Sequence, residues 1–187
     1  NIFVTNGFET KEAIELAKDF LDIATIDFKG NADNEFYRRN ISVSGPEPIF
    51  ETIKLMKDAG IHIEITDLVV PKIGDNLESL KSMLLKLKDI LGLDVPISFL
   101  RFFPYYKLSY LEPTPYETLI SHYKTAKSMG FKFVYIGNVP GSKYQNTYCP
   151  NCKRLLVKRD NMSTIKLNLT KEGKCKYCGY DIGYKLI

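Results

Sequence analysis

Four cysteines are the residues of this chain whose types and spacing most directly predict chemistry. They form two pairs, Cys149-Pro-Asn-Cys152 and Cys175-Lys-Tyr-Cys178, and the 187-residue chain has no others. Two short loops that each present two thiolates can complete the tetrahedral coordination that Zn²⁺ prefers. Two disulfides are the alternative, but a two-residue spacing suits a metal-binding turn better, and nothing like a secretory signal precedes the pairs. We therefore predict a metal site that holds zinc, with iron as the minor alternative.

Composition and charge narrow the class of protein. The chain is 44% hydrophobic and 26% charged, which is typical of a globular protein, and no apolar run reaches the roughly 20 residues of a membrane span. We expect a cytoplasmic protein with no membrane contact. Residues 141–187 contain ten Lys or Arg and three Asp or Glu. Such a segment can bind nucleic acid, but a solvated lysine-rich surface is the more common reason for it, so nucleic acid is not the expected partner.

The elements that must position other functional groups alternate along the first 140 residues. Short β-branched runs alternate with amphipathic stretches, which predicts a parallel sheet with helical crossovers. No G-x-G-x-x-G or phosphate-binding loop motif is present, which weakens a nucleotide-binding open sheet and leaves part of a (β/α) barrel as the other possibility. We place a domain boundary near Pro140, with 1–140 as the barrel part and 141–187 as a separate metal-binding tail. The expected strands are 2–5, 23–28, 61–70, 97–101 and 133–136, and the expected helices are 10–21, 46–59, 77–91 and 116–129.

Polar side chains gather at the carboxyl ends of the expected strands, where functional groups of parallel α/β folds meet. Alternate residues of a strand share a face, so Asp27 and Lys29 point the same way, as do Glu64 and Thr66. A cavity that mixes carboxylate, ammonium, hydroxyl and amide groups suits a zwitterionic or hydroxyl-rich small ligand. The candidates are Thr5, Asn6, Asp27, Lys29, Glu64, Thr66, Arg101 and Tyr106.

Structural roles for the same residues stay open. Asp27 and Lys29 could form an internal ion pair, Glu64 could face solvent, and Arg101 could lie on the surface. The chain has two histidines, and we expect His122 to be exposed in the middle of a helix. No catalytic triad can be assembled from the sequence.

The ordered motifs of the chain resemble a known family. It is similar to the radical S-adenosylmethionine protein of the AmmeMemoRadiSam system, a relative of pyruvate formate-lyase activating enzymes. The resemblance covers nearly the whole chain. The motifs that carry it are Phe3-Val4-Thr5-Asn6-Gly7, Ile26-Asp27-Phe28-Lys29-Gly30, Phe36-Tyr37-Arg38, Gly45-Pro46-Glu47-Pro48-Ile49, Ile63-Glu64-Ile65-Thr66, Leu68-Val69-Val70-Pro71, Arg101-Phe102-Phe103-Pro104-Tyr105-Tyr106-Lys107-Leu108, Pro113-Thr114-Pro115, Val134-Tyr135-Ile136-Gly137-Asn138-Val139 and the two cysteine pairs.

The resemblance implies a partial (β/α) barrel in an enzyme that uses a [4Fe–4S] cluster to cleave S-adenosylmethionine to a 5′-deoxyadenosyl radical, which abstracts hydrogen from a substrate. The cluster motif of the family, C-x3-C-x2-C, does not occur in this chain. We therefore expect the chain to be the carboxyl-terminal portion of the barrel, inactive alone. The partners implied are the missing amino-terminal segment and, further, a protein substrate or other members of the same system.

The resemblance also implies roles for single residues. Asp27 and Lys29 match a D-x-K motif beside S-adenosylmethionine, and Thr5 matches a contact of that cofactor and of a monovalent cation. An Asp that precedes Thr5 in activating enzymes is Val4 here. Thr66 stands where those enzymes have Arg, and Tyr106 stands where they have a His near the cofactor.

The tail resembles a zinc ribbon whose four cysteines fill the metal's coordination, so the metal is expected to be structural. Lys153 replaces the glycine that usually follows the second cysteine of such a loop, whereas Gly179 keeps it. The rival hypothesis is a zinc-ribbon binding module on an α/β scaffold that recognises nucleic acid or a protein.

Overall fold

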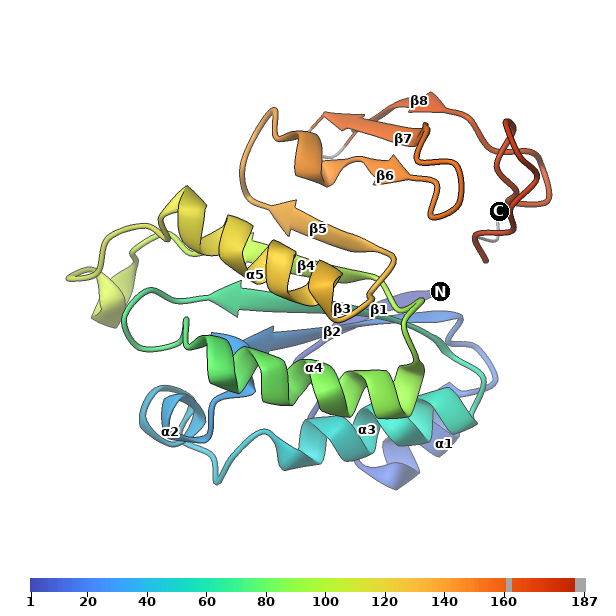
Figure 1. Ribbon diagram of the computed structural model, residues 1–187. Coiled ribbons are helices and arrows are strands. Elements are labelled where there is room, and N and C mark those ends of the chain that lie inside the picture. Colours follow the sequence, from blue (N-terminus) through green and yellow to red (C-terminus); the bar gives the residue numbers. More distant parts are fainter. Residues whose placement is uncertain (161–162, 184–187) are drawn as a thin grey trace. The chain divides into compact units, whose positions relative to one another are not determined.

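The structure is a computed structural model that describes residues 1–160 and 163–183. The chain divides into two compact units, Asn1–Val134 and Tyr135–Ile187. The predicted boundary near Pro140 stays a prediction. The strands of the first sheet are β1 (Ile2–Thr5), β2 (Ile23–Lys29), β3 (His62–Val69), β4 (Ile97–Arg101) and β5 (Val134–Gly137), and its main helices are α1 (Lys11–Ala17), α3 (Glu47–Asp58), α4 (Leu77–Leu91) and α5 (Tyr116–Ser128) (Figure 1).

The first sheet is parallel, and its strands lie in the order β1-β2-β3-β4-β5. Each strand follows its neighbour through a helix, as right-handed βαβ crossovers require. Helix α4 begins where the side chain of Asn76 accepts hydrogen bonds from the amides of Glu78 and Ser79, which satisfies two of the free N–H groups at the helix start. Helix α1 begins in the same way at Thr10 but ends at Ala17, earlier than the expected Leu21.

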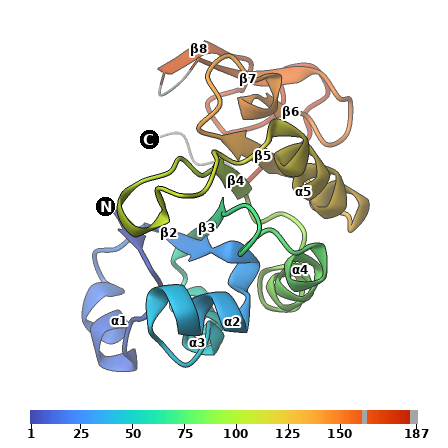
Figure 2. The ribbon, with the colours of Figure 1, turned by 90° about the vertical axis from the view of Figure 1, so that its left-hand side faces the viewer.

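Helices cover one face of this sheet. Figure 2 shows α1, α3 and α4 on the same side of β2 and β3. Side chains alternate accordingly along each strand: Ile26 and Phe28 of β2 and Ile65 of β3 are almost fully buried on the helix side, whereas the residues between them are half-buried. A sheet with helices on one face and polar residues on the other is a piece of a (β/α) barrel. The predicted partial barrel with a ribbon-like appendage is confirmed.

A segment of short turns joins β2 to α3, and the sequence pattern did not indicate it. It contains the turn η1 (Gly30–Ala32), the short helix α2 (Asn34–Phe36) and a π-helical turn η2 (Tyr37–Ile41). The side chain of Asp33 caps α2 by accepting a hydrogen bond from the Phe36 amide at 2.9 Å. This segment places a hydrogen-bonded loop directly after the carboxyl end of β2.

The second unit contains an antiparallel sheet of three strands in the order β6-β7-β8. These strands are β6 (Thr147–Tyr148), β7 (Leu155–Asp160) and β8 (Ser163–Leu167), and a turn η4 (Lys143–Gln145) precedes them. Its small core contains Leu156 and Val157 of β7 together with Leu169, Cys149 and Cys175. With so little apolar area to bury, a unit of this size depends on an additional cross-link or metal for stability.

In the part of the chain that the structure describes, no helix is both long and apolar enough to cross a membrane.

Candidate functional site

The carboxyl ends of β2 and β3 bring three of the predicted residues together on the helix-free face. Asp27 and Thr66 are register partners on the two strands, and the Thr66 hydroxyl donates a hydrogen bond to Asp27 Oδ1 at 2.8 Å. The ammonium of Lys29 lies 2.5 Å from Asp27 Oδ2. These side chains are about one-third exposed at most, so the ion pair is neither buried away from a ligand nor freely solvated. Thr66 fixes one carboxylate oxygen and Lys29 the other.

Glu64 extends this group toward the amino end of β3, and we call Asp27, Lys29, Glu64 and Thr66 together the polar strip. Glu64 shares the helix-free face with Thr66, and its register partner on β2 is Thr25. Within residues 1–160 and 163–183, the Glu64 carboxylate has no hydrogen bond or ion pair, and the side chain is half-buried. The strip therefore carries one carboxylate that is already paired and one that is available to a cationic or hydroxyl group.

Thr5 and Asn6 lie next to this strip but do not join it. Thr5 is aligned with the buried Ile26, which puts it on the helix side of the sheet, and its hydroxyl donates to Glu9 Oε1 at 2.5 Å. The side chain of Asn6 accepts a hydrogen bond from the Phe8 amide at 3.2 Å. Both residues stabilise the turn after β1, in which Gly7 has a φ of 78°.

Arg101 and Tyr106 are also placed apart from the strip. Arg101 is aligned with Val69, its Nε donates to the Thr114 carbonyl at 2.9 Å, and its guanidinium lies over the Phe103 ring. Tyr106 is 75% exposed in the turn η3 (Tyr106–Leu108). The loop that carries these residues is anchored by the buried Thr114, whose hydroxyl donates to the Val69 carbonyl at 2.6 Å. No sequence signal beyond the Pro-Thr-Pro motif indicated that anchor.

Three fully buried polar residues lie behind the strip, on the helix side of the sheet: Asn31, Asp67 and His122. The expectation that His122 is exposed is wrong. His122 lies three residues after the buried Leu119 and four before the buried Ala126, a spacing that puts it on the inner face of α5. The same kind of signal marks Asp67, which alternates with the buried Ile65 and Val69 of β3.

Burial shifts the pKa values of Asp67, His122 and the neighbouring Tyr37. It raises the pKa of Asp67 to about 7, against the hydrogen bond that the Asn31 amide donates to the carboxylate. It lowers the pKa of His122 and raises the pKa of Tyr37. Each shift favours the neutral form of a group removed from water. The Oδ2 atom of Asp67 is buried without a hydrogen-bond partner, which the protonated carboxyl tolerates better than the carboxylate.

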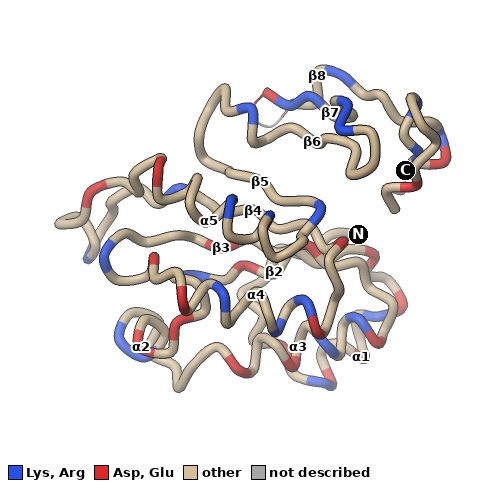
Figure 3. Tube along the Cα trace, viewed as in Figure 1, with Lys and Arg blue, Asp and Glu red and all other residues tan. Residues whose placement is uncertain are grey.

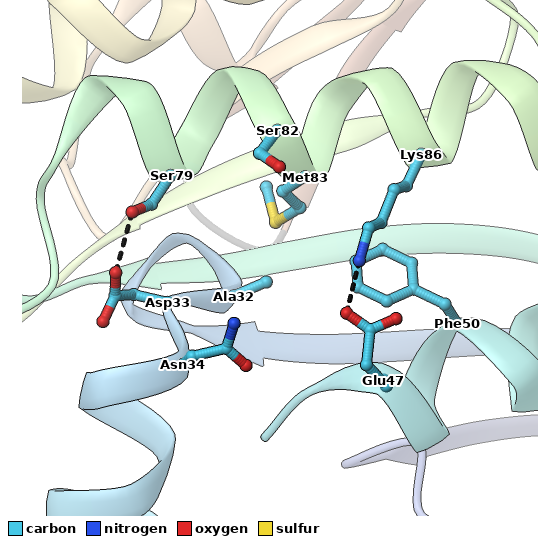
Figure 4. Close-up of a pocket in the computed structure, with 9 residues that line it drawn as sticks. All are labelled: Ala32, Asp33, Asn34, Glu47, Phe50, Ser79, Ser82, Met83 and Lys86. Carbon is cyan, nitrogen blue, oxygen red and sulfur yellow. Dashed lines mark hydrogen bonds and ion pairs between the residues drawn. The ribbon is translucent and has the colours of Figure 1, made fainter.

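A pocket of about 150 Å³ lies between the loop after β2 and the helices α3 and α4. Figure 4 shows two interactions across it: Ser79 with Asp33, and Lys86 with Glu47. Its remaining lining residues include Phe50 and Met83, which are part of the core. None of the predicted site residues lines this pocket, so it is separate from the strip on the helix-free face.

The second unit brings all four cysteines together. Their sulfur atoms lie within 4.8 Å of one another, with Cys149 and Cys178 at 3.6 Å and Cys152 and Cys175 at 3.8 Å. These separations are far longer than the roughly 2 Å of a disulfide bond. They match the spacing of about 3.8 Å expected between sulfurs around one tetrahedral Zn²⁺ at about 2.3 Å. The donor set therefore fits a zinc ion.

The two cysteine loops have the same backbone geometry. Lys153 and Gly179, the residues after the second cysteine of each pair, have φ values of 62° and 72°. Their amides donate to the carbonyls of Cys149 and Cys175, each at 2.9 Å. Glycine adopts this conformation without a steric cost, whereas Lys153 does not.

The thiols differ in their readiness to ionise. The backbone amide of Tyr180 and neighbouring polar groups lower the pKa of Cys178 to about 6. Burial raises the pKa of Cys149 to about 11. A thiol that ionises reluctantly without a metal becomes a thiolate when a divalent cation supplies compensating charge. Cys178 can thus offer the first thiolate and Cys149 requires the metal.

Lys and Arg residues recur along β7 and β8 of the three-stranded sheet (Figure 3). Lys158 and Lys166 are register partners on β7 and β8, and both are exposed. Arg159 has a structural role, because its guanidinium donates to the Gln145 carbonyl and to Thr147 Oγ1.

Comparisons with known proteins support the fold and leave the activity open. No family model matches the chain. The uncharacterized protein MJ0808 of Methanocaldococcus jannaschii is 44% identical over 183 residues, which are 97% of this chain and 54% of that protein. The chain therefore spans about half the length of this relative.

Two solved structures resemble the chain in fold. A domain of pyruvate-formate lyase-activating enzyme from Bacteroides vulgatus has a TM-score of 0.60 and 17% identity, covering 73% of this chain and 80% of that one. A radical SAM methyltransferase from Sphaerobacter thermophilus has a TM-score of 0.53 and 10% identity, covering 72% and 39%. The predicted likeness to radical S-adenosylmethionine enzymes is confirmed for the fold, and the predicted place in the AmmeMemoRadiSam system stays a prediction.

Proposed function

We propose that this chain is part of a radical S-adenosylmethionine enzyme and that its helix-free sheet face binds S-adenosylmethionine. The observation that carries the proposal is the Asp27–Lys29–Thr66 cluster at the carboxyl ends of β2 and β3, in a fold similar to a domain of an activating enzyme. The ligand offers an ammonium, a carboxylate, a ribose diol and a sulfonium. An arranged carboxylate and ammonium, with the unpaired Glu64 beside them, complement these groups.

The chain does not supply the iron–sulfur cluster that such an enzyme needs. Its four cysteines are all placed together in the second unit, where a closed set of thiolates fits a structural metal. The cluster and its electron would therefore come with another polypeptide segment, and the role proposed for this chain is limited to binding and orienting S-adenosylmethionine.

The edge of the first sheet supports a further segment as partner. Ile2 and Val4 of β1 are 63% and 78% exposed, and Leu16 of α1 and Phe20 in the turn after it are 77% and 53% exposed. An unpaired strand edge beside an apolar helical surface is a place where another strand and helix can add.

Reductive cleavage of S-adenosylmethionine tests this proposal. The chain is co-expressed with the part of MJ0808 that it does not match, and the assembly is loaded with iron and sulfide without oxygen. Dithionite is added as the electron donor, and 5′-deoxyadenosine is measured. Product that falls at least tenfold with Lys29→Met, and is unchanged with the exposed Lys54→Met, supports the proposal. A loaded assembly that forms no product contradicts it.

A second candidate function rests on the charge of the second unit. Lys158 and Lys166 face each other across an antiparallel pair, an arrangement that costs stability unless an anion lies between them. We infer that the sheet β6-β7-β8 can bind a polyanion such as single-stranded nucleic acid. Affinity for an oligonucleotide should then fall steeply with salt and weaken further in the K158Q/K166Q double variant. Arg159 is unsuitable for this test because it stabilises the unit.

A further inference from the structure

The loop after β2 has an unusual backbone. Gly30, Asn31 and Ala32 have consecutive φ values of 61°, 60° and 53°. Two of these residues are not glycine, and such conformations persist only where surrounding interactions hold them. The loop follows Lys29 directly, so its conformation determines how the carboxyl end of β2 presents the Asp27–Lys29 pair.

Asn31 holds this loop through three hydrogen-bond donors that reach three different parts of the first unit. Its backbone amide donates to Asp67 Oδ1 on β3 at 3.1 Å. Its side-chain Nδ2 donates to the carbonyl of Asn76, just before α4, at 2.9 Å. Nδ2 also lies 3.0 Å from His122 Nε2 on α5, and Asn31 Oδ1 lies 3.2 Å from the same ring nitrogen.

The surroundings of His122 determine its tautomer. Its Nδ1 lies 2.8 Å from the Thr118 carbonyl, which can only accept, so Nδ1 carries the proton. Burial lowers the pKa of His122 and so favours the neutral ring. In the neutral ring with a proton on Nδ1, Nε2 is an acceptor and can receive the Asn31 Nδ2 hydrogen. In this assignment His122 Nδ1 donates to the Thr118 carbonyl, and Asn31 Nδ2 donates both to His122 Nε2 and to the Asn76 carbonyl, while the nearby Asn31 Oδ1 receives no proton from the ring. An aspartate at position 31 would lose both side-chain donors.

Neighbouring residues restrain the loop on both sides of Asn31. The Lys29 amide donates to the Tyr37 hydroxyl at 3.3 Å, and the Ser79 hydroxyl of α4 donates to Asp33 Oδ2 at 2.8 Å. Figure 4 shows the Ser79–Asp33 contact beside Ala32. The loop is thus fixed to the helix layer while Lys29 projects from the opposite face of the sheet.

We propose that Asn31, held by Asp67 and His122, is a positioning residue that fixes the loop after β2 and thereby the Asp27–Lys29 pair for ligand binding. This inference rests on the proposed S-adenosylmethionine site. Asn31 acts from the helix side and does not contact the ligand.

Two matched variants of His122 test, in the 187-residue chain, whether the His122–Asn31 hydrogen bond fixes the loop after β2. His122→Gln keeps an acceptor for the Asn31 side chain, whereas His122→Phe keeps a ring and removes the acceptor. We expect the glutamine variant to bind S-adenosylmethionine like the wild type and the phenylalanine variant to bind about tenfold more weakly. Amide exchange at Asn31 should rise only in the phenylalanine variant. Equal affinities in all three proteins overturn the proposal.

Two further measurements keep the test decisive if His122→Phe does not fold. Asn31→Gly accepts the positive φ but has no side-chain donor, and it too should bind about tenfold more weakly. ¹⁵N spectra of the His122 ring in the wild type should show a proton on Nδ1 alone. A proton on Nε2 would mean that Nε2 does not accept from Asn31, and this overturns the proposal whether or not a ligand binds. A wild-type chain that shows no affinity contradicts the proposed function itself, whereas wild-type binding that Asn31→Gly leaves unchanged contradicts only this inference.

Discussion

The Thr66 hydroxyl donates a hydrogen bond to Asp27 Oδ1 across neighbouring parallel strands, at 2.8 Å. This contact holds the carboxylate while its other oxygen binds Lys29. Thr66 is neutral, so Lys29 is the cation that balances Asp27.

Replacing Thr66 with valine removes this hydrogen bond and keeps the shape of the side chain. We expect Thr66→Val to lower the free energy of unfolding by about 1 kcal/mol and to weaken S-adenosylmethionine binding, because Asp27 becomes free to rotate. Urea titration and calorimetry measure the two effects. Thr25→Val is the matched control on the same face of β2, since no hydrogen bond of the Thr25 side chain occurs among the described residues. Equal effects of the two substitutions would argue against a special role for Thr66.

The sequence predicted the parts of this site that depend on local periodicity. Alternation along β2 and β3 placed Asp27 with Lys29 and Glu64 with Thr66, and the structure has both pairs on one face. The candidate list did not separate Thr5 and Arg101 from this face, because it grouped residues by their place at strand ends. Alternation from Phe99 puts Arg101 on the helix side. The register partners Ile26 and Val69 of Thr5 and Arg101 are buried on that side.

The buried polar group was missed for a different reason. A polar residue is normally predicted to be exposed when the sequence does not show a partner for it. The partners of Asn31 lie far away in the chain, on β3 and α5. Only the tertiary fold brings them together. The clustering of the four cysteines, in contrast, followed from their spacing, because each short loop already determines the separation of its two sulfurs.

Asp67 should make the stability of the first unit depend on pH. Its folded-state pKa is raised to about 7, so the stability it contributes is fully present below its unfolded pKa of about 3.9 and is lost as pH rises through 7. Asp67→Asn keeps an acceptor for the Asn31 amide and removes the titration. The wild type should therefore lose stability relative to this variant as the pH rises. The difference in unfolding free energy, variant minus wild type, should increase by on the order of 2 kcal/mol between pH 5 and pH 8.

Urea denaturation across this pH range measures that difference, with the exposed Asp58→Asn as control. A gain that does not change with pH would mean that Asp67 is ionised in the folded chain over the whole range.

Lys153 adopts a backbone conformation that favours glycine. Lys153→Gly should raise the free energy of unfolding of the metal-bound second unit by about 0.5–1 kcal/mol. Lys153→Ala removes the side chain but keeps the unfavourable φ, so it should bring no gain. Gly179→Ala should destabilise by a similar amount, because no atom lies near the added methyl and only the φ of 72° opposes it. Thermal denaturation of the three variants tests the argument, and stabilisation by alanine at position 153 would contradict it.

Metal removal should unfold the second unit and spare the first. Metal analysis should find one zinc per chain. A chelator under reducing conditions should remove the chemical-shift dispersion of the amide resonances of residues 147–178, while the resonances of β2 and β3 keep theirs. Cys152→Ser should behave like the chelated protein. Resonances of the second unit that persist after verified metal loss would show that its small core suffices for folding.

On this proposal, the helix-free face of the first sheet binds S-adenosylmethionine. Adding this ligand to the ¹⁵N-labelled chain and following every amide resonance tests it most directly. We predict that the largest shifts occur at the carboxyl ends of β2 and β3, around Asp27, Lys29 and Thr66, and that Lys29→Met removes them. Shifts confined to the second unit, or none at saturating ligand, would contradict the account.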